Sequence, residues 1–417
     1  MSNSEPLSFM KKVQLFVLSI GPGLFIIGYN IGTGSVTSMA STGAEYGMTL
    51  TLPLLLSCIF TYILIVVFGK YTLVTGDTVI FSYKKHFGKS AGLFVLVALI
   101  FTEAVGSVGV MAIVTQVTQE WTRPLTESGN GIDPLYSTFG YGVILYALLW
   151  NGKQNFFEKV LAVFVGVMGL SFLVTMFMVI PEPAQVISGV FSGIPNETGA
   201  FLLVASMVGT TMGAVIYVVR SVLIKGKGWG MEQLPLEKRD AKISAVIMFV
   251  LSISVMAAAA GTMYQEGIKV DNAIDMVKLL EPFAGRFAIT IFVGGILAAG
   301  LSSLFPHIML APMLLADYKG ENPDFQSKTN RLISLGIILL SFTVPLFGGR
   351  PVFIMILSQV FIATVTPIVI LLMFILMNKK QVVGEHTLSP IKNLLVGLIL
   401  IFSIIMAVLG LIGIFSL

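Results

Sequence analysis

Long apolar segments follow one another along almost the whole chain, and the polar stretches between them are only long enough for loops. Most of these segments run for about 20 residues, the length that an α-helix needs to cross a bilayer. Charged residues make up 11% of the 417 residues, whereas soluble domains contain about 25%. The sequence therefore predicts an all-α integral membrane protein that consists of a single transmembrane domain over 1–417. The lipid bilayer is its expected partner. We expect eleven spans, at 13–41, 49–69, 91–118, 139–150, 160–180, 200–220, 243–262, 287–312, 332–347, 353–377 and 394–416.

Basic residues fall mostly on one side of these spans. With the N-terminus in the cytoplasm, five of the 25 Lys and Arg lie outside and the remaining 20 lie inside. An excess of Lys and Arg marks cytoplasmic loops. We therefore expect a cytoplasmic N-terminus and, with an odd number of spans, an external C-terminus, in the inner or cytoplasmic membrane of a bacterial cell. This placement also explains the net charge of +4, so the charge indicates no nucleic-acid partner.

The first span contains a polar interruption where a simple lipid-facing helix would have Leu, Ile and Val. Its middle reads Asn30-Ile31-Gly32-Thr33-Gly34-Ser35. Glycine lowers helix propensity, and Thr and Ser compete for backbone hydrogen bonds. Irregular backbone at membrane depth is tolerated where it lines a cavity within the protein. We interpret the stretch as a broken helix beside a substrate site; close helix packing through small residues is the alternative.

A second interruption lies in span six, where Met207 to Ala214 combine small residues and hydroxyls between apolar flanks. Breaks at corresponding places in two halves point to a transporter built from repeats. We therefore expect a LeuT-type arrangement of 5+5 inverted repeats, over about 13–180 and 200–377, with an extra helix at 394–416. The cargo would be a small solute or ion.

Glu103 is the one acid placed well inside a span, and His307 is the one histidine there. Ionisable groups within membranes are costly and usually mark pathways. Both residues are candidates for proton coupling. The alternatives are a protonated Glu103 that bonds a neighbouring helix, a packing role for His307, or His307 as a replacement ligand. No second acid lies near Glu103 in the sequence.

Enzyme activity is not indicated. The chain has no phosphate-binding Gly-Lys-Ser/Thr loop and no zinc-type pair of histidines, so the sequence predicts neither a cofactor nor a catalytic site. Its one cysteine, Cys58, cannot form an internal disulfide.

Motifs along nearly the whole chain resemble those of the natural resistance-associated macrophage protein (Nramp) family of proton-coupled divalent metal transporters. The matching residues are Gly21-Pro-Gly23, Gly43-Ala-Glu-Tyr-Gly47, Thr75-Gly76-Asp77, Glu103 with Val105-Gly106, Glu158-Lys159-Val160, Gly300-Leu-Ser-Ser303, and Leu357-Ser-Gln359 with Pro367. The resemblance implies the LeuT-type fold with eleven helices.

The residues that would hold the metal in this family are different here. Gly32-Thr33-Gly34-Ser35 aligns with the family's Asp-Pro-Gly-Asn, and Gly213 falls at its helix-six Met, with Met212 one position away. Val215, Val365 and Ile100 take the places of a His, a Gln and an Asp. Hard divalent cations favour carboxylate and other oxygen ligands, so these changes predict a cargo other than the usual transition metals, and no metal ligand is assigned.

Three functions remain open at this stage. The first is an Nramp-like secondary active transporter, proton-coupled, with alternating access at the two breaks. The second is a divalent metal transporter with a site rebuilt from Glu103, His307, Met212 or Gln359. The third is an uncoupled facilitator or sensor on the same fold. For the first function we expect the cargo to contact Asn30, Gly32, Thr33, Gly34, Ser35, Thr210, Thr211, Met212, Gly213 and Gln359.

Overall fold

The computed structural model describes residues 23–151, 183–270 and 281–416, together with residue 275 and a few isolated residues between 163 and 177. Over this part of the chain the structure is helical, with no strand. The start of the first predicted span, the motif at Glu158–Val160 and most of the fifth span, at 160–180, lie outside the described residues.

The other predicted spans are all helical within the described residues. Eight helices there are long and apolar enough to cross a membrane. The predicted fourth span corresponds to α7, which begins five residues earlier than expected, at Pro134, and is not one of these eight helices. The main helices are α2 (Gly23–Asn30), α3 (Thr33–Tyr46), α4 (Thr51–Thr75), α6 (Lys89–Thr122), α7 (Pro134–Asn151), α10 (Thr198–Met212), α11 (Ala214–Gly226), α12 (Leu234–Ala259), α14 (Glu281–Lys319), α15 (Lys328–Leu340), α17 (Pro351–Met377) and α19 (Pro390–Phe415).

Shorter elements connect these helices or extend them. They are α5 (Val79–Phe87), η1 (Arg123–Leu125), α9 (Pro183–Phe191), η2 (Met231–Gln233), a π-helical turn η3 (Ala260–Tyr264), α16 (Thr343–Phe347), α18 (Lys380–Val383) and η4 (Gly384–His386).

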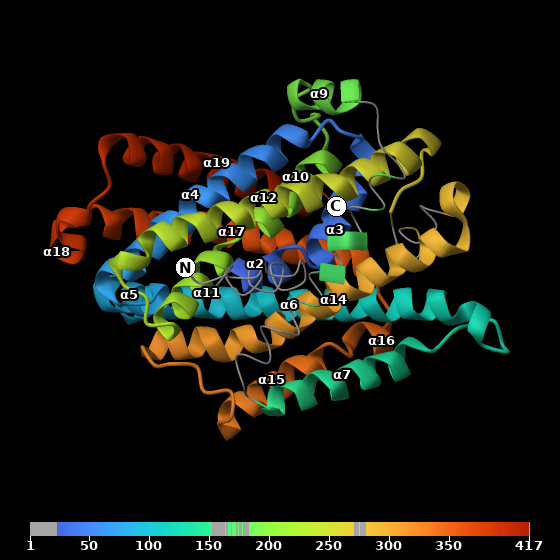
Figure 1. The fold of residues 1–417 in the computed structure, drawn as a ribbon, viewed down its shortest axis with the longest axis horizontal. Helices are drawn as coiled ribbons and strands as arrows, with labels where there is room; N and C mark the ends of the chain where they lie inside the picture. Colours follow the sequence, from blue (N-terminus) through green and yellow to red (C-terminus); the bar gives the residue numbers. More distant parts are fainter. Residues whose placement is uncertain are drawn as a thin grey trace, which may run out of the picture.

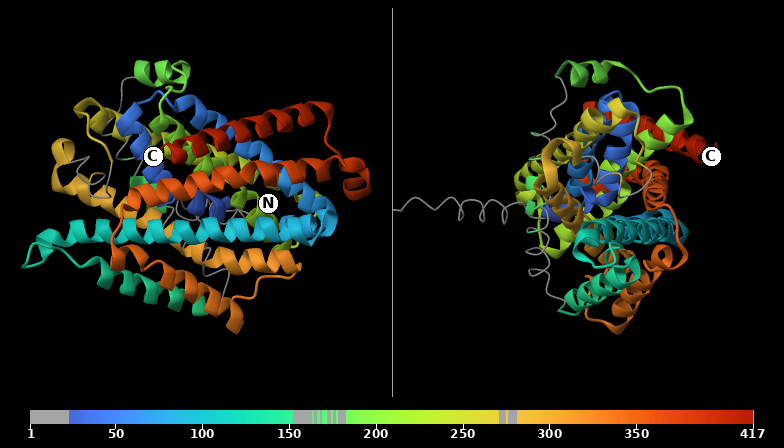
Figure 2. Two further views of the ribbon diagram at one scale, coloured as in Figure 1. Left: turned by 180° about the vertical axis from the view of Figure 1, so that it is seen from behind. Right: turned by 90° about the vertical axis from the view of Figure 1, so that its right-hand side faces the viewer.

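Two interrupted pairs, α2–α3 and α10–α11, lie in the middle of the molecule (Figure 1). The helices α4, α12, α6, α14 and α17 surround them, and α7, α15 and α19 lie at the edges in both views of Figure 2. The central helices are also more buried than the outer ones. The most apolar stretch of α10–α11 is 100% buried inside the protein, whereas that of α19 is 33% buried. The apolar surface of the outer helices is therefore available for contact with lipid, while the central pairs are enclosed by protein.

The first N–H groups of the short helix α5 donate hydrogen bonds to two other helices, and the first of them, at Val79, donates to the hydroxyl of Ser221 on α11 at 3.2 Å. The backbone N–H groups of Ile80 and Phe81 donate to the carboxylate of Asp317 on α14, at 3.1 and 3.0 Å. The residue before α5, Thr78, makes no side-chain cap of its own. Asp317 thus satisfies N–H groups that the first turn of a helix leaves without partners.

A buried ion cluster joins α11 to α12. Arg220 donates to both carboxylate oxygens of Glu237, at 2.9 and 2.7 Å, and pairs with Asp240 at 2.7 Å. All three side chains are almost fully buried. The sequence does not predict this cluster, because Arg220 ends the expected span 200–220 and the two acids lie in the expected loop before 243, where charges are ordinarily solvated.

Candidate functional site between the two broken helices

The first break consists of two residues. α2 ends at Asn30 and α3 begins at Thr33, so only Ile31 and Gly32 are non-helical. A Cβ atom at Gly32 would lie 2.2 Å from Oγ of Ser303 on α14, so glycine is what lets these helices approach so closely. The predicted break is confirmed, but it ends earlier than expected because residues 33–35 form the first turn of α3.

The second break is the single residue Gly213, with φ −62° and ψ 140° between α10 and α11. The first amide of α11, at Ala214, donates to the hydroxyl of Thr366 on α17 at 3.0 Å. On the other side, the hydroxyl of Thr210 donates to the carbonyl of Asn30 at 3.3 Å. That bond joins the two breaks directly, as the repeat interpretation requires of a shared site.

A small cavity lies between the two breaks and the helices α14 and α17. Its free volume is about 10 Å³, which is the space that one water molecule needs. The cavity as described is therefore closed around at most one small species. It is lined by Tyr29, Asn30, Gly34, Gly209, Thr210, Ser303, His307 and Gln359.

Glu103 lies behind this cavity and has two partners. The Tyr29 hydroxyl donates to Oε1 of Glu103 at 2.6 Å, and Nδ1 of His307 lies 2.7 Å from Oε2. The three side chains come from α2, α6 and α14. Distant spans therefore bring a phenol and an imidazole to the carboxylate of Glu103.

The far nitrogen of His307 is the unusual atom of this group. His307 is 3% exposed and lines the cavity, and its Nε2 has no hydrogen-bond partner among the described residues. With Glu103 ionised, Nδ1 of His307 must carry the proton, and in the neutral ring Nε2 then presents a lone pair. A histidine held by a carboxylate in this way has the arrangement found at metal ligands.

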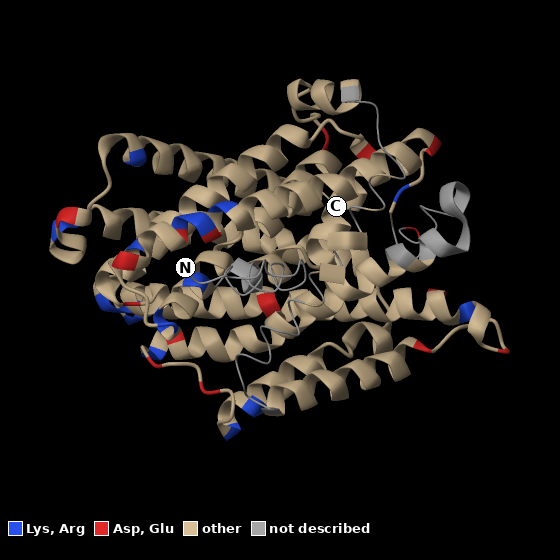
Figure 3. Cartoon of the chain, in the orientation of Figure 1, with Lys and Arg blue, Asp and Glu red and all other residues tan. Residues whose placement is uncertain are grey.

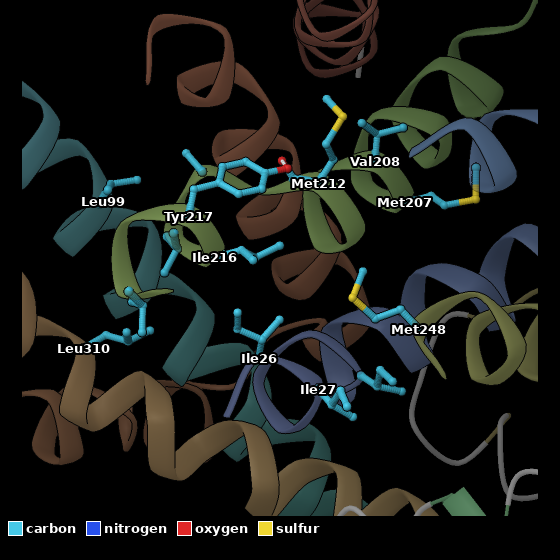
Figure 4. Close-up of a cluster of buried hydrophobic side chains, with 14 of the residues drawn as sticks. Ile26, Ile27, Leu99, Met207, Val208, Met212, Ile216, Tyr217, Met248 and Leu310 are labelled. Carbon is cyan, nitrogen blue, oxygen red and sulfur yellow. Dashed lines mark hydrogen bonds between the residues drawn. The ribbon is translucent and has the colours of Figure 1, made fainter. Parts of the chain in front are cut away.

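Several predicted site residues are buried near the breaks but are not part of the cavity lining. Thr211 donates to Ser57 on α4 at 2.7 Å, and the hydroxyl of Ser35 lies 3.3 Å from that of Ser252 on α12. The hydroxyl of Thr33 has no partner among the described residues. In Figure 4 the side chain of Met212 points away from the helix that carries Ile26 and Ile27. These residues shape the breaks rather than face the cavity.

Sequence reasoning missed four residues at this site. Tyr29, Gly209 and Ser303 line the cavity, and the sulfur of Met248 accepts a hydrogen bond from the Asn30 amide at 3.1 Å. Tyr29 directly precedes Asn30, and Ser303 ends the motif Gly300–Ser303, so both carried a signal. Met248 carried none, because nothing in the sequence places α12 against the first break.

Comparison with known proteins assigns the family. A model for "Natural resistance-associated macrophage protein-like" proteins matches residues 23–413. The chain belongs to the Nramp family. Nramp relatives of this chain include proteins named Divalent metal cation transporter MntH. The one from Caldanaerobacter subterraneus is 24% identical over 65% of this chain and 65% of its own length.

Other relatives carry the same name. The protein from Clostridium acetobutylicum is 24% identical over 52% of this chain, and the one from Listeria innocua is 22% identical over 92%. The chain thus spans about two thirds or less of the first two relatives, 65% and 50%, and 86% of the Listeria protein.

Solved structures of transporters share the fold of this Nramp member. A manganese transporter from Eremococcus coleocola superposes with a TM-score of 0.74 at 14% identity, covering 100% of this chain and 90% of that one. Mhp1, a nucleobase-cation-symport-1 family transporter, superposes with a TM-score of 0.64 at 16% identity, covering 95% and 90%. At these identities the likeness shows the fold alone, which confirms the expected all-α, LeuT-like architecture. The number of eleven spans stays a prediction.

Proposed function

We propose that this chain is a secondary active transporter that binds a metal cation between its two helix breaks and exposes that site alternately to the two sides of the membrane. The observation that carries the proposal is His307 in the cavity lining: its Nε2 has no hydrogen-bond partner among the described residues, and its Nδ1 lies 2.7 Å from Oε2 of Glu103. The relatives named for divalent metal transport support a cation as cargo. The role is transport rather than catalysis.

The residues around the cavity favour a cation that binds nitrogen and neutral oxygen. Neutral imidazole suits Zn²⁺, Cu²⁺, Fe²⁺ and Ni²⁺, whereas Mg²⁺ and Ca²⁺ prefer carboxylates. Asn30 Oδ1 has no hydrogen-bond partner among the described residues, and Gln359 supplies a second amide. Glu103 would contribute its negative charge through His307 without touching the cation. This is the rebuilt site, with Met212 left out.

The same histidine offers a route for proton coupling. A proton on Nε2 of His307 removes the lone pair that a cation needs, so proton and cation compete for one atom. Glu103 would hold the orientation of the ring throughout, and Tyr29 would hold Glu103. Coupling in this proposal therefore needs no second acid near Glu103.

The decisive experiment is metal uptake by the purified protein in liposomes, with Zn²⁺, Ni²⁺ and Fe²⁺ offered separately as the cations that suit imidazole. We expect saturable uptake by the wild type, and a loss of at least about tenfold in H307Q and E103Q, as for changes to a metal ligand or its supporting residue. The matched control is H386Q, since His386 lies in η4, away from the cavity. Uptake that is unchanged in H307Q would overturn the rebuilt site.

A second candidate cargo is a neutral or zwitterionic solute, because the cavity lining contains no carboxylate. Such a cargo would raise the unfolding temperature of the detergent-solubilised protein, while metals would leave it unchanged. A third outcome separates coupling from flux: downhill cation movement that is insensitive to a proton gradient would indicate an uncoupled facilitator.

A further inference from the structure

An apolar groove lies between α7 and α15, far from the two breaks. Figures 1 and 2 show these helices next to each other at one edge of the molecule. The groove has a volume of about 640 Å³. It is lined by Phe139, Gly142, Val143, Tyr146, Ala147, Trp150, Leu335, Ile338, Leu339 and Phe342.

The α15 wall of the groove changes character along its length. Leu335 and Ile338 of α15 line the groove, with Phe342 just beyond the end of the helix. Side chains three or four residues apart lie on one helix face. The same spacing continued toward the start of α15 reaches Arg331 and then Lys328. One face of α15 is therefore cationic at its first turn and apolar beyond it.

The α7 wall meets this cationic end with an aromatic ring. The guanidinium carbon of Arg331 lies 3.7 Å from the ring centroid of Trp150, and Nη2 donates to the Trp150 carbonyl at 3.5 Å. Nε of Arg331 has no partner among the described residues. Tryptophan and arginine together are typical of the boundary between hydrocarbon and headgroups.

The length of the groove fits one leaflet of a bilayer. Arg331 and Phe342 are eleven positions apart, which at 1.5 Å per residue is about 17 Å. The hydrocarbon core is about 30 Å thick, so one leaflet provides about 15 Å. The charged end lies on the side that the distribution of Lys and Arg assigns to the cytoplasm.

We infer that this groove binds an anionic phospholipid of the cytoplasmic leaflet, with one acyl chain between α7 and α15 and the headgroup phosphate at Arg331 and Lys328. Basic residues at the mouth of a pocket between membrane helices recognise acidic headgroups. Guanidinium matches phosphate because it can donate two parallel hydrogen bonds. This inference about lipid does not depend on which cargo the transporter carries.

The test compares phosphatidylglycerol with phosphatidylcholine of identical acyl chains. The full-length protein is delipidated, incubated with each lipid, and the lipid that remains bound is counted by native mass spectrometry. We expect about a fivefold preference for phosphatidylglycerol, the effect of about one well-placed cation. In R331Q this preference should fall to about one, whereas K89Q, a change of an exposed Lys at the start of α6, should retain it.

A second variant tests the groove separately from the charge. A147W would fill the groove and abolish retention of both lipids, while I144W, on the same helix but outside the groove lining, would leave retention unchanged. Equal retention of the two lipids by the wild type, or unchanged retention in A147W, would overturn the inference. So would a change in oligomeric state in A147W with lipid retention intact, because the groove would then be a contact between copies of the chain.

Discussion

At the scale of single residues, Arg220 is a fully buried charge that faces two buried acids. One guanidinium faces the carboxylates of Glu237 and Asp240, and both acids come from the same helix. α4 closes over the cluster, since a Cβ atom at Gly69 would lie 2.3 Å from Oε1 of Glu237. Removal of the cation would leave two buried carboxylates facing each other.

We expect R220M to destabilise the protein by about 3–5 kcal/mol, because it breaks a buried ion pair and leaves its partners uncompensated. The unfolding midpoint in detergent measures this effect. K380M is the matched control, since the pair between Lys380 and Glu385 is largely exposed and surface pairs contribute little. A midpoint for R220M equal to that of the wild type would show that the cluster is not needed for stability.

The sequence predicts the positions of the two helix breaks better than the contacts around them. Gly32 and Gly213 break their helices as predicted, because glycine and hydroxyl residues in an apolar segment are a local signal. The pairing of Glu103 with His307 joins residues 204 positions apart. That contact depends on which spans are neighbours, and apolar composition alone does not encode which helices pack together.

At the scale of elements, the break in α10–α11 depends on one small residue. A Cβ atom at Gly213 would lie 2.5 Å from the carbonyl oxygen of Gly209 and 2.6 Å from a methyl group of Ile362. The first contact is with the backbone of α10 and the second is with α17. A side chain at this position must therefore displace one helix from the other, next to the cavity.

We expect G213A to lower the rate of cargo uptake by at least about tenfold, because a displacement of about 1 Å at a site can cost a hundredfold in rate. G226A, at the other end of α11, is the control, because its Cβ would meet nothing within 4 Å. Alanine in a helix is favoured over glycine, so G226A should keep full uptake and a slightly higher unfolding midpoint. Equal uptake by both variants would show that the shape of the break is not important for transport.

At the scale of the whole molecule, the distribution of charge defines two unlike ends. Lys and Arg gather at the end that carries α5 and α18, and few lie at the opposite end (Figure 3). Because basic residues are retained in the cytoplasm, the end with α5 and α18 is the cytoplasmic face in our proposal.

Labelling with a membrane-impermeant maleimide tests this orientation. Cys58 is the one cysteine of the chain and is buried, so background labelling should be low. On intact cells we expect S128C, in the loop after α6, to be labelled, and S90C, at the start of α6, to be labelled only after the cells are permeabilised. Labelling of S90C in intact cells would reverse the proposed orientation.

The bond between Asp317 and α5 makes two distant parts of the chain mechanically dependent. The first three N–H groups of α5 donate to other helices, at Val79 to Ser221 on α11 and at Ile80 and Phe81 to Asp317 in the last turns of α14. Ten residues before Asp317 on the same helix, His307 lines the cavity. A tilt of the last turns of α14 would therefore pull on the first turn of α5 through Asp317. In this way a change at the buried cavity would alter the position of α5 at the proposed cytoplasmic face.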